Sequence, residues 1–224
     1  MEKVVITGAL GYIGTELCKI YSGVSWHHNV IILDNRFISE RVNQIRNWNM
    51  EFIHGDILDK ELVNRIFKDA DIVHHLAGVT DVPRTKSEST QEKDKKIKLV
   101  GEKGTQNILE AISNECKIIF PSTHVIYEGI DKVKNDIKEN EVSAPVLSYS
   151  QSKAINEKQL KKSGKNYIIL RLGSVYGYSS DTARIDIMPN LFSKISSQDG
   201  TLRLFSGGKQ IKSFEALPHV ASSS

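Results

Sequence analysis

The chain has 224 residues, which is long enough to bury a full hydrophobic core. Its net charge of +3 is the difference between 30 basic and 27 acidic residues, a balance that argues against a nucleic-acid or membrane surface. No apolar run is long enough to span a bilayer, and an apolar segment follows Met1 almost at once, so we expect no signal peptide. The two cysteines, Cys18 and Cys116, predict free thiols in a reducing cytoplasm.

The first 21 residues predict a strand, a glycine-rich turn and a helix. Residues 3–7 are largely β-branched, Gly8, Gly11 and Gly14 follow, and an apolar helical pattern continues to residue 21. Gly8 would permit a tight turn, Gly11 the close approach of a pyrophosphate, and Gly14 the packing of helix on strand. The helix N-terminus would supply N–H groups and a positive dipole end. Three glycines alone are also compatible with an ordinary loop.

The next strand supports the nucleotide-binding interpretation. Residues 30–33 are apolar, as in a buried parallel strand, and they end in Asp34, twenty residues after Gly14. A dinucleotide-binding site places a carboxylate there to bind the adenosine ribose. Asp34 would repel a 2′-phosphate by roughly 4 kcal/mol at about 4 Å and a dielectric constant of ~20, so NAD is favoured over NADP. Arg36 would partly offset this repulsion.

Strand and helix patterns alternate along most of the remaining chain. We expect strands over 52–54, 72–76, 117–120 and 167–172, with helices around 62–67, 99–112 and after 148. This alternation predicts an α/β fold, a Rossmann-type doubly wound parallel sheet with helices on both faces. Beyond Gly177 the pattern loosens, to a helix over 188–195 and a short strand over 202–205. The expected domains are an NAD-binding domain over 1–177 and a short, incomplete substrate-binding portion over 178–224.

The seven histidines do not predict a metal site. His74 and His75 are neighbours on an expected strand and therefore point to opposite faces. His27 and His28 lie in a polar connection without a carboxylate or cysteine at ligand spacing.

Tyr149 and Lys153 are four residues apart and fall on one face of an expected helix. A free tyrosine has a pKa near ~10, so acting as a base at neutral pH requires a shift of about 3 units, or roughly 4 kcal/mol. A unit charge about 4 Å away at an effective dielectric of ~20 supplies roughly that amount. The pair therefore fits a tyrosine base activated by a lysine, although a solvated helical pair has the same spacing.

Together these segments resemble the extended short-chain dehydrogenase/reductase family, in particular the UDP-galactose 4-epimerase-like group of NAD-dependent epimerases and dehydratases. The resemblance runs from Lys3 to about Ala221 and implies NAD as cofactor, a nucleotide sugar as substrate, a homodimer and a cytoplasmic location. The segments that carry it are 7–14, 33–35, 55–57, 75–78, 120–127, 149–153 and 170–171.

The resemblance also implies roles for individual residues. Thr123 would hold the reacting oxygen, Tyr149 would be the general base, and Lys153 would bind the nicotinamide ribose and lower the tyrosine pKa. The implied cofactor contacts are Gly8, Gly11, Tyr12, Ile13, Gly14, Asp34, Asn35, Asp56, Ile57, Leu76, Ala77, Gly78, Tyr149 and Lys153. The implied substrate contacts are Thr80, Ser122, His124, Ser174 and Lys212.

The sequence departs from the family pattern mainly on the substrate side. Gly101 and Ser174 stand where asparagine is usual, and Lys212 begins a segment that is usually led by arginine. Pro218 and His219 replace an expected acidic position. Family members also continue well beyond this segment, so the chain is either truncated or carries a minimal lobe.

The residues after Thr123 bear on the reaction. Related 4,6-dehydratases carry Asp-Glu at the positions of His124 and Val125, and related decarboxylases need the glutamate, so both reactions are disfavoured. Epimerisation is the favoured reaction. The alternatives are a net dehydrogenase or reductase of a sugar nucleotide or other alcohol, and a non-catalytic NAD-binding module.

Overall fold

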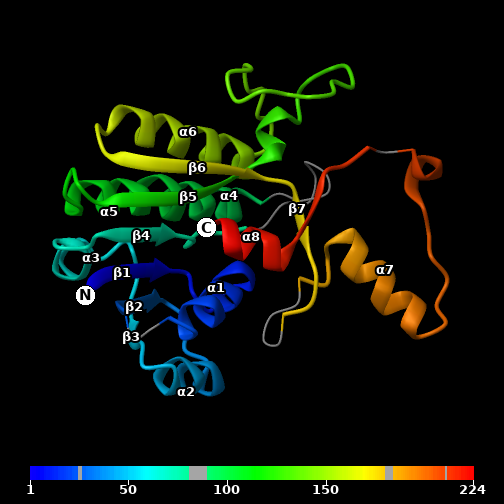
Figure 1. Cartoon of the computed structure of the whole chain (residues 1–224). Helices are drawn as coiled ribbons and strands as arrows, with labels where there is room; N and C mark the ends of the chain where they lie inside the picture. Colours follow the sequence, from blue (N-terminus) through cyan, green and yellow to red (C-terminus); the bar gives the residue numbers. More distant parts are fainter. Residues whose placement is uncertain (25–26, 81–89, 180–183, 210) are drawn as a thin grey trace.

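The computed structural model describes residues 1–24, 27–80, 90–179, 184–209 and 211–224. Its centre is a six-stranded parallel sheet in the order β3-β2-β1-β4-β5-β6 (Figure 1). This order confirms the predicted Rossmann-type sheet. The strands are β1 (Glu2–Thr7), β2 (His28–Asp34), β3 (Glu51–His54), β4 (Ile72–His75), β5 (Lys117–Thr123) and β6 (Asn166–Leu172).

Helices cover both faces of the sheet because the central strands are apolar on both sides. Val4 and Ile6 of β1 pack in one hydrophobic layer, whereas Val5 packs in the other, as the two-residue period of a strand requires. The helices of this part are α1 (Tyr12–Ser22), α2 (Ser39–Asn47), α3 (Lys60–Phe67), α4 (Gln91–Lys98), α5 (Gly104–Ala111) and α6 (Ser148–Lys162). A π-helical segment η2 (Leu99–Lys103) joins α4 to α5, and the 3-10 turn η3 (His124–Tyr127) follows β5.

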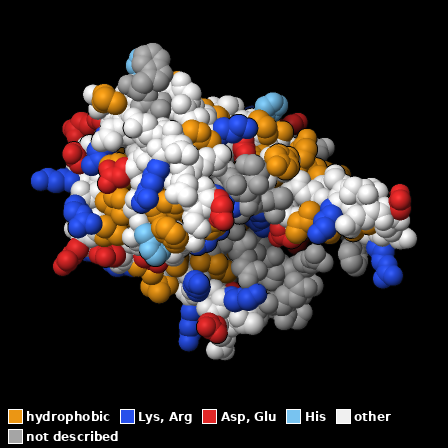
Figure 2. All heavy atoms as spheres, turned by 90° about the horizontal axis from the view of Figure 1, so that it is seen from below, with side chains coloured by type: hydrophobic (Ala, Val, Ile, Leu, Met, Phe, Trp, Pro, Cys, Tyr) orange, Lys and Arg blue, Asp and Glu red, His pale blue; other side chains and the backbone are white. Residues whose placement is uncertain are grey.

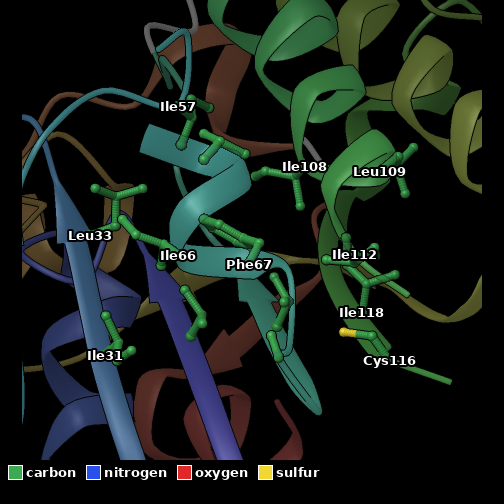
Figure 3. Packing of buried hydrophobic residues seen from close by; sticks show 14 of the residues in the cluster. Ile31, Leu33, Ile57, Ile66, Phe67, Ile108, Leu109, Ile112, Cys116 and Ile118 are labelled. Carbon is green, nitrogen blue, oxygen red and sulfur yellow. The ribbon is translucent and has the colours of Figure 1, made fainter. Parts of the chain in front are cut away.

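The two layers have different helices. Side chains from α1 and α2 fill one layer, and side chains from α3, α5 and α6 fill the other. In the second layer, Phe67 and Ile108 are completely buried (Figure 3). This packing holds the carboxyl ends of the strands in place, and the candidate site lies at these ends.

The C-terminal part is smaller and returns to the main body. β7 (Ser174–Tyr176) pairs in parallel with β8 (Phe214–Ala216), and α8 (Leu217–Ser223) packs against α1 (Figure 1). Leu217, Val220 and Ala221 are buried in that contact. The division into domains at residue 177 stays a prediction, and the small sheet pairs strands from both sides of it.

The helix expected over 188–195 is confirmed as α7 (Met188–Ser197). The strand expected over 202–205 is wrong: residues 201–204 are exposed and unpaired within the described chain, and the 3-10 turn η4 (Phe205–Gly208) follows. A short apolar run forms a strand only where a neighbouring strand bonds its backbone, and β7 and β8 pair with each other instead.

Basic and acidic side chains are interspersed over the face seen in Figure 2, as the balanced composition predicts. None of the described helices is both long enough and apolar enough to cross a membrane.

Candidate active site

The carboxyl ends of the parallel strands meet at one edge of the sheet, and a cleft of about 2040 Å³ lies there. The strand order reverses between β1 and β4, so Gly8 after β1 and Ala77 after β4 lie side by side at the switch point. Ligands of open α/β sheets bind at this position. The ends of β5 and β6 complete the edge and carry Thr123 and Gly173 into the cleft lining.

Steric contact explains the glycines of the first turn. Gly8 has φ +67°, and a Cβ on it would lie 2.7 Å from the backbone nitrogen of Ala77. A Cβ on Gly14 would lie 2.5 Å from Cα of Ala9, and one on Gly11 would lie 3.0 Å from the carbonyl oxygen of Gly8. Backbone segments therefore approach each other closely at this turn, and a side chain at Gly8 or Gly14 would collide with them.

The first turn of α1 is suited to an anionic group. Gly11 is the N-cap and offers no side-chain cap, so the N–H groups of the first turn have no acceptor within the helix. Gly11, Tyr12, Ile13 and Gly14 line the cleft. A pyrophosphate would satisfy these N–H groups and gain from the positive end of the helix dipole.

Asp34 lies at the end of β2 beside this turn, as predicted, and is 5% exposed. Its Oδ2 accepts the backbone N–H of Leu10 at 2.9 Å, and its Oδ1 accepts the backbone N–H of Arg36 at 2.9 Å. The Arg36 Nε lies 3.4 Å from the same Oδ1. Because the guanidinium is about half exposed, it offsets only part of the carboxylate charge.

Two further predicted cofactor residues meet beyond β2. The Asn35 amide donates a 3.0 Å hydrogen bond to Asp56 Oδ2, while Asp56 Oδ1 accepts the backbone N–H of Leu58 at 2.9 Å. Ile57 lines the cleft, and its side chain packs in the core against Gly104. These contacts place Asn35, Asp56 and Ile57 together beside the glycine turn.

The predicted catalytic residues come together at the other end of the cleft. Thr123 is the last residue of β5, Tyr149 lies in the first turn of α6, and both residues line the cleft. The Nζ of Lys153 donates a 2.6 Å hydrogen bond to the carbonyl of Pro121 and lies 4.3 Å from the centre of the Phe120 ring. A phenol, a hydroxyl and an ammonium therefore line one wall.

The expectation that Lys153 lowers the pKa of Tyr149 stays a prediction, because Lys153 is not among the groups that shift this pKa in the structure. Burial raises the pKa of Tyr149, and the charge of Arg184 and the Thr123 hydrogen bond oppose this only in part. Burial also lowers the pKa of Lys153 to about 8, against the opposing effect of Glu157. The Lys153 ammonium donates to the Pro121 carbonyl.

No local sequence pattern points to the residue that fixes the start of the Tyr149 helix. The N-cap Leu147 has no side-chain cap, and Oε1 of Glu128 accepts the backbone N–H groups of Val146 and Leu147 at 2.8 and 2.7 Å. It also accepts the Ser150 hydroxyl. Glu128 thus caps the helix from a distant segment, where no local spacing could reveal it.

The predicted substrate residues line the same cleft but differ in accessibility. Thr80 and Lys212 are exposed, and Ser174 lies in β7. His124 Nδ1 lies 3.0 Å from the Leu172 carbonyl; since a carbonyl only accepts, Nδ1 carries the proton.

Ser122 is 3% exposed, and its hydroxyl donates to Glu157 at 2.6 Å, so it is engaged within the protein. The sequence did not point to Glu215, another cleft residue, whose Oε1 accepts the Gly173 N–H at 2.9 Å.

Gly101, where an asparagine was expected, has a packing reason. A Cβ there would collide with the Ser152 hydroxyl, and the Gly101 carbonyl accepts the Asn156 amide at 3.0 Å. Glycine thus leaves room for the Ser152 hydroxyl where α6 approaches η2.

The two adjacent histidines of β4 point to opposite faces, as predicted. His74 bonds the Tyr21 hydroxyl at 2.7 Å beside α1, whereas His75 lies between the hydroxyls of Thr7 and Thr105 at 3.1 and 2.9 Å. The described part of the chain has no cluster of three or more histidine, cysteine or acidic residues able to hold a metal ion.

Comparison with known proteins agrees with this geometry. The profile of the NAD dependent epimerase/dehydratase family matches residues 4–216, so the chain belongs to that family. This finding confirms the resemblance inferred from the motifs.

Two curated relatives carry different reactions. The chain is 30% identical over 198 residues to a dTDP-D-glucose 4,6-dehydratase of Dictyostelium discoideum, covering 79% of the chain and 44% of that protein. It is 29% identical over 171 residues to a UDP-glucose 4-epimerase of Neisseria meningitidis serogroup C, covering 71% of the chain and 48% of that protein. The chain thus spans less than half the length of either relative.

Solved structures share the fold over nearly the whole chain. The UDP-glucuronic acid 4-epimerase of Bacillus cereus, solved with UDP-glucuronic acid and NAD, is 25% identical with a TM-score of 0.79, covering 98% of this chain and 70% of that one. The UDP-N-acetylglucosamine 4-epimerase of Methanobrevibacter ruminantium M1, solved with UDP-N-acetylmuramic acid, is 26% identical with a TM-score of 0.79, covering 99% and 71%.

The steric role of the glycine turn can be tested with two alanine variants. We expect Gly14→Ala to lower the free energy of unfolding by about 1–3 kcal/mol, because its Cβ would meet fixed backbone. Gly78→Ala is the matched control, since its Cβ would meet nothing within 4 Å, and should stay within about 0.5 kcal/mol of the unaltered chain. Urea unfolding measures both, and equal losses would contradict the steric explanation.

Proposed function

We propose that the protein is an NAD-dependent nucleotide-sugar epimerase. The observation that carries this proposal is that Thr123, Tyr149 and Lys153, the last two one turn apart on α6, line the same cleft as the glycine turn. The membership of the NAD dependent epimerase/dehydratase family and the relatives solved with nucleotide sugars support it.

The residues present fit NAD. The first turn of α1 would bind the pyrophosphate through free N–H groups, and Asp34 would bind the adenosine ribose beside it. Asn35 and Asp56 would lie against the adenine end, and Lys153 against the nicotinamide ribose. Bound NAD would supply the acceptor, and later the donor, of the hydride at the sugar carbon.

Tyr149 would take the proton from the reacting sugar hydroxyl, and the Thr123 hydroxyl would hold the oxygen in place. Burial disfavours the phenolate, whereas Thr123 and the charge of Arg184 favour it. The Lys153 ammonium, once released from the Pro121 carbonyl to a ribose hydroxyl, would add to that effect. The ketone of the sugar would then turn in the cleft and regain hydrogen on its other face, which inverts the carbon.

The residues beside Thr123 favour epimerisation over water elimination. His124 donates through Nδ1 to the Leu172 carbonyl, and Val125 has no titratable group, so this pair offers no carboxylate for elimination. A net dehydrogenase or reductase would use the same Tyr149 base and is distinguished by accumulation of NADH.

The homodimer and the cytoplasmic location are further predictions from the family.

A non-catalytic NAD-binding module is the second candidate, and the C-terminal part favours it. None of the α7 residues is buried. A substrate would therefore meet few closing elements on that side of the cleft.

Asp34 predicts selectivity for NADH over NADPH. We expect NADH to bind at least about tenfold more tightly, a difference of about 1.4 kcal/mol, in a fluorescence titration. Arg36→Gln should widen the difference, because it removes the charge that offsets the Asp34 carboxylate. Equal affinities in the unaltered chain would show that Arg36 dominates.

The catalytic assignment predicts different effects of two variants. After a screen of UDP-, GDP- and dTDP-sugars has identified a substrate, Tyr149→Phe should abolish turnover and keep NADH binding, whereas Lys153→Ala should weaken both. Tyr178→Phe is the control, because that tyrosine is 82% exposed and should be silent. Near-normal turnover by Tyr149→Phe would refute Tyr149 as the base.

The open C-terminal side predicts weak catalysis by the 224-residue chain. We expect NADH to bind, because the cofactor residues lie within the main sheet, and nucleotide sugars to turn over slowly, because few residues hold the sugar. A product assay with each sugar nucleotide tests this. Rapid turnover with micromolar substrate affinity would show that the small C-terminal part suffices.

A further inference from the structure

A buried carboxylate lies one helical turn beyond Lys153. Glu157 is 4% exposed, and its Oε1 accepts the Ser122 hydroxyl at 2.6 Å and the Arg171 Nε at 2.9 Å. Its Oε2 accepts the Arg171 Nη2 at 2.7 Å, which completes a two-pronged ion pair. Lys161, another cation near Glu157, is half exposed, and its Nζ lies 3.7 Å from Oε2.

The same ion pair joins the elements that form the reacting end of the cleft. Arg171 lies opposite Ser122 in the β5–β6 register, and Ser122 directly precedes Thr123. The Nη1 of Arg171 donates to the Glu139 carbonyl at 2.9 Å and to the Tyr127 hydroxyl at 2.5 Å. The guanidinium therefore ties α6, η3 and the following loop to β6, and Glu157 adds β5 through Ser122.

We propose that the Glu157–Arg171 ion pair is a positioning element of the site, which fixes the Thr123 strand end against α6 and gives the Lys153 ammonium its counter-charge. This inference rests on the proposed role of Lys153 in cofactor binding. Glu157 and Arg171 touch neither cofactor nor substrate in this assignment, so they act through Ser122 and Lys153.

The charges around Lys153 support the proposal. Burial lowers the pKa of Lys153 to about 8, and Glu157 acts in the opposite direction. The other ionisable neighbour, His75 of β4, is buried and has its pKa lowered to about 3, so it is neutral and adds no counter-charge. Burial raises the pKa of Glu157, but the hydrogen bonds from Arg171 and Ser122 outweigh this and hold it low.

Removing Glu157 and removing Arg171 should shift the pKa of Lys153 in opposite directions. In Glu157→Gln the counter-charge is lost, so the pKa of Lys153 should fall by about half a unit or more. In Arg171→Gln the carboxylate is no longer compensated, so the pKa of Lys153 should rise. General loosening of the fold would let water reach Lys153 and move both variants the same way, so the opposite signs identify the electrostatic role.

The experiment is a ¹³C NMR titration of the lysine side chains, with Lys153→Met used to assign the Lys153 signal. Lys161→Met is the matched control, because it removes only the exposed neighbour of Glu157 and should leave the Lys153 titration within about 0.2 units. Circular dichroism verifies that each variant is folded. A fall of the Lys153 pKa in Glu157→Gln decides even if Arg171→Gln does not fold, because loosening of the fold would raise that pKa. No shift, or shifts of one sign in both variants, would overturn the proposal.

A second readout separates this inference from the proposed function. NADH affinity of the unaltered chain should fall as Lys153 loses its proton above about pH 8, and the midpoint should move to lower pH in Glu157→Gln. Absence of NADH binding by the unaltered chain would overturn the proposed function, and the role of the ion pair in it. Binding with the same midpoint in Glu157→Gln would overturn the inference alone.

Discussion

The site depends on how closely the chain leaving β1 approaches the chain leaving β4. Gly8 leaves no room for a side chain against Ala77, and the Thr7 hydroxyl accepts the Ala77 N–H at 3.0 Å. His75 holds the same hydroxyl at 3.1 Å and reaches the Thr105 hydroxyl of α5 at 2.9 Å. This buried polar chain anchors the switch point of the sheet to a helix behind it, so the turn that would hold a pyrophosphate is fixed before any ligand arrives.

At the Tyr149 end of the cleft, the free-energy cost of burying charged groups dominates. A phenol and an ammonium are both costly to bury in their ionised forms, and the structure shows the pKa of Tyr149 raised and that of Lys153 lowered to about 8. The protein compensates with partners behind the site. The Pro121 carbonyl accepts a hydrogen bond from the ammonium, and the Glu157–Arg171 pair lies one helical turn beyond Lys153.

The C-terminal part packs on the main body through a small sheet and one helix, but it offers a substrate few buried contacts. β7 and β8 form their own small sheet, and α8 covers α1, so the main body is sealed on that side. α7, in contrast, has no buried residue. The glycine-turn end of the cleft is therefore formed by the main sheet, whereas the C-terminal side is bounded by exposed residues such as Lys212.

The sequence by itself determined the elements whose geometry is local. Alternating apolar residues place Val4 and Val5 on opposite faces of a strand, glycine spacing marks the turn before α1, and a separation of four residues puts Tyr149 and Lys153 on one helix face. The tertiary structure alone decided what surrounds them. Glu128 caps the Tyr149 helix and Arg171 pairs with Glu157 across strands, while residues 202–205 lack the neighbour that a strand requires. Burial, counter-charge and strand pairing depend on residues far apart in the chain, and local spacing carries no information about them.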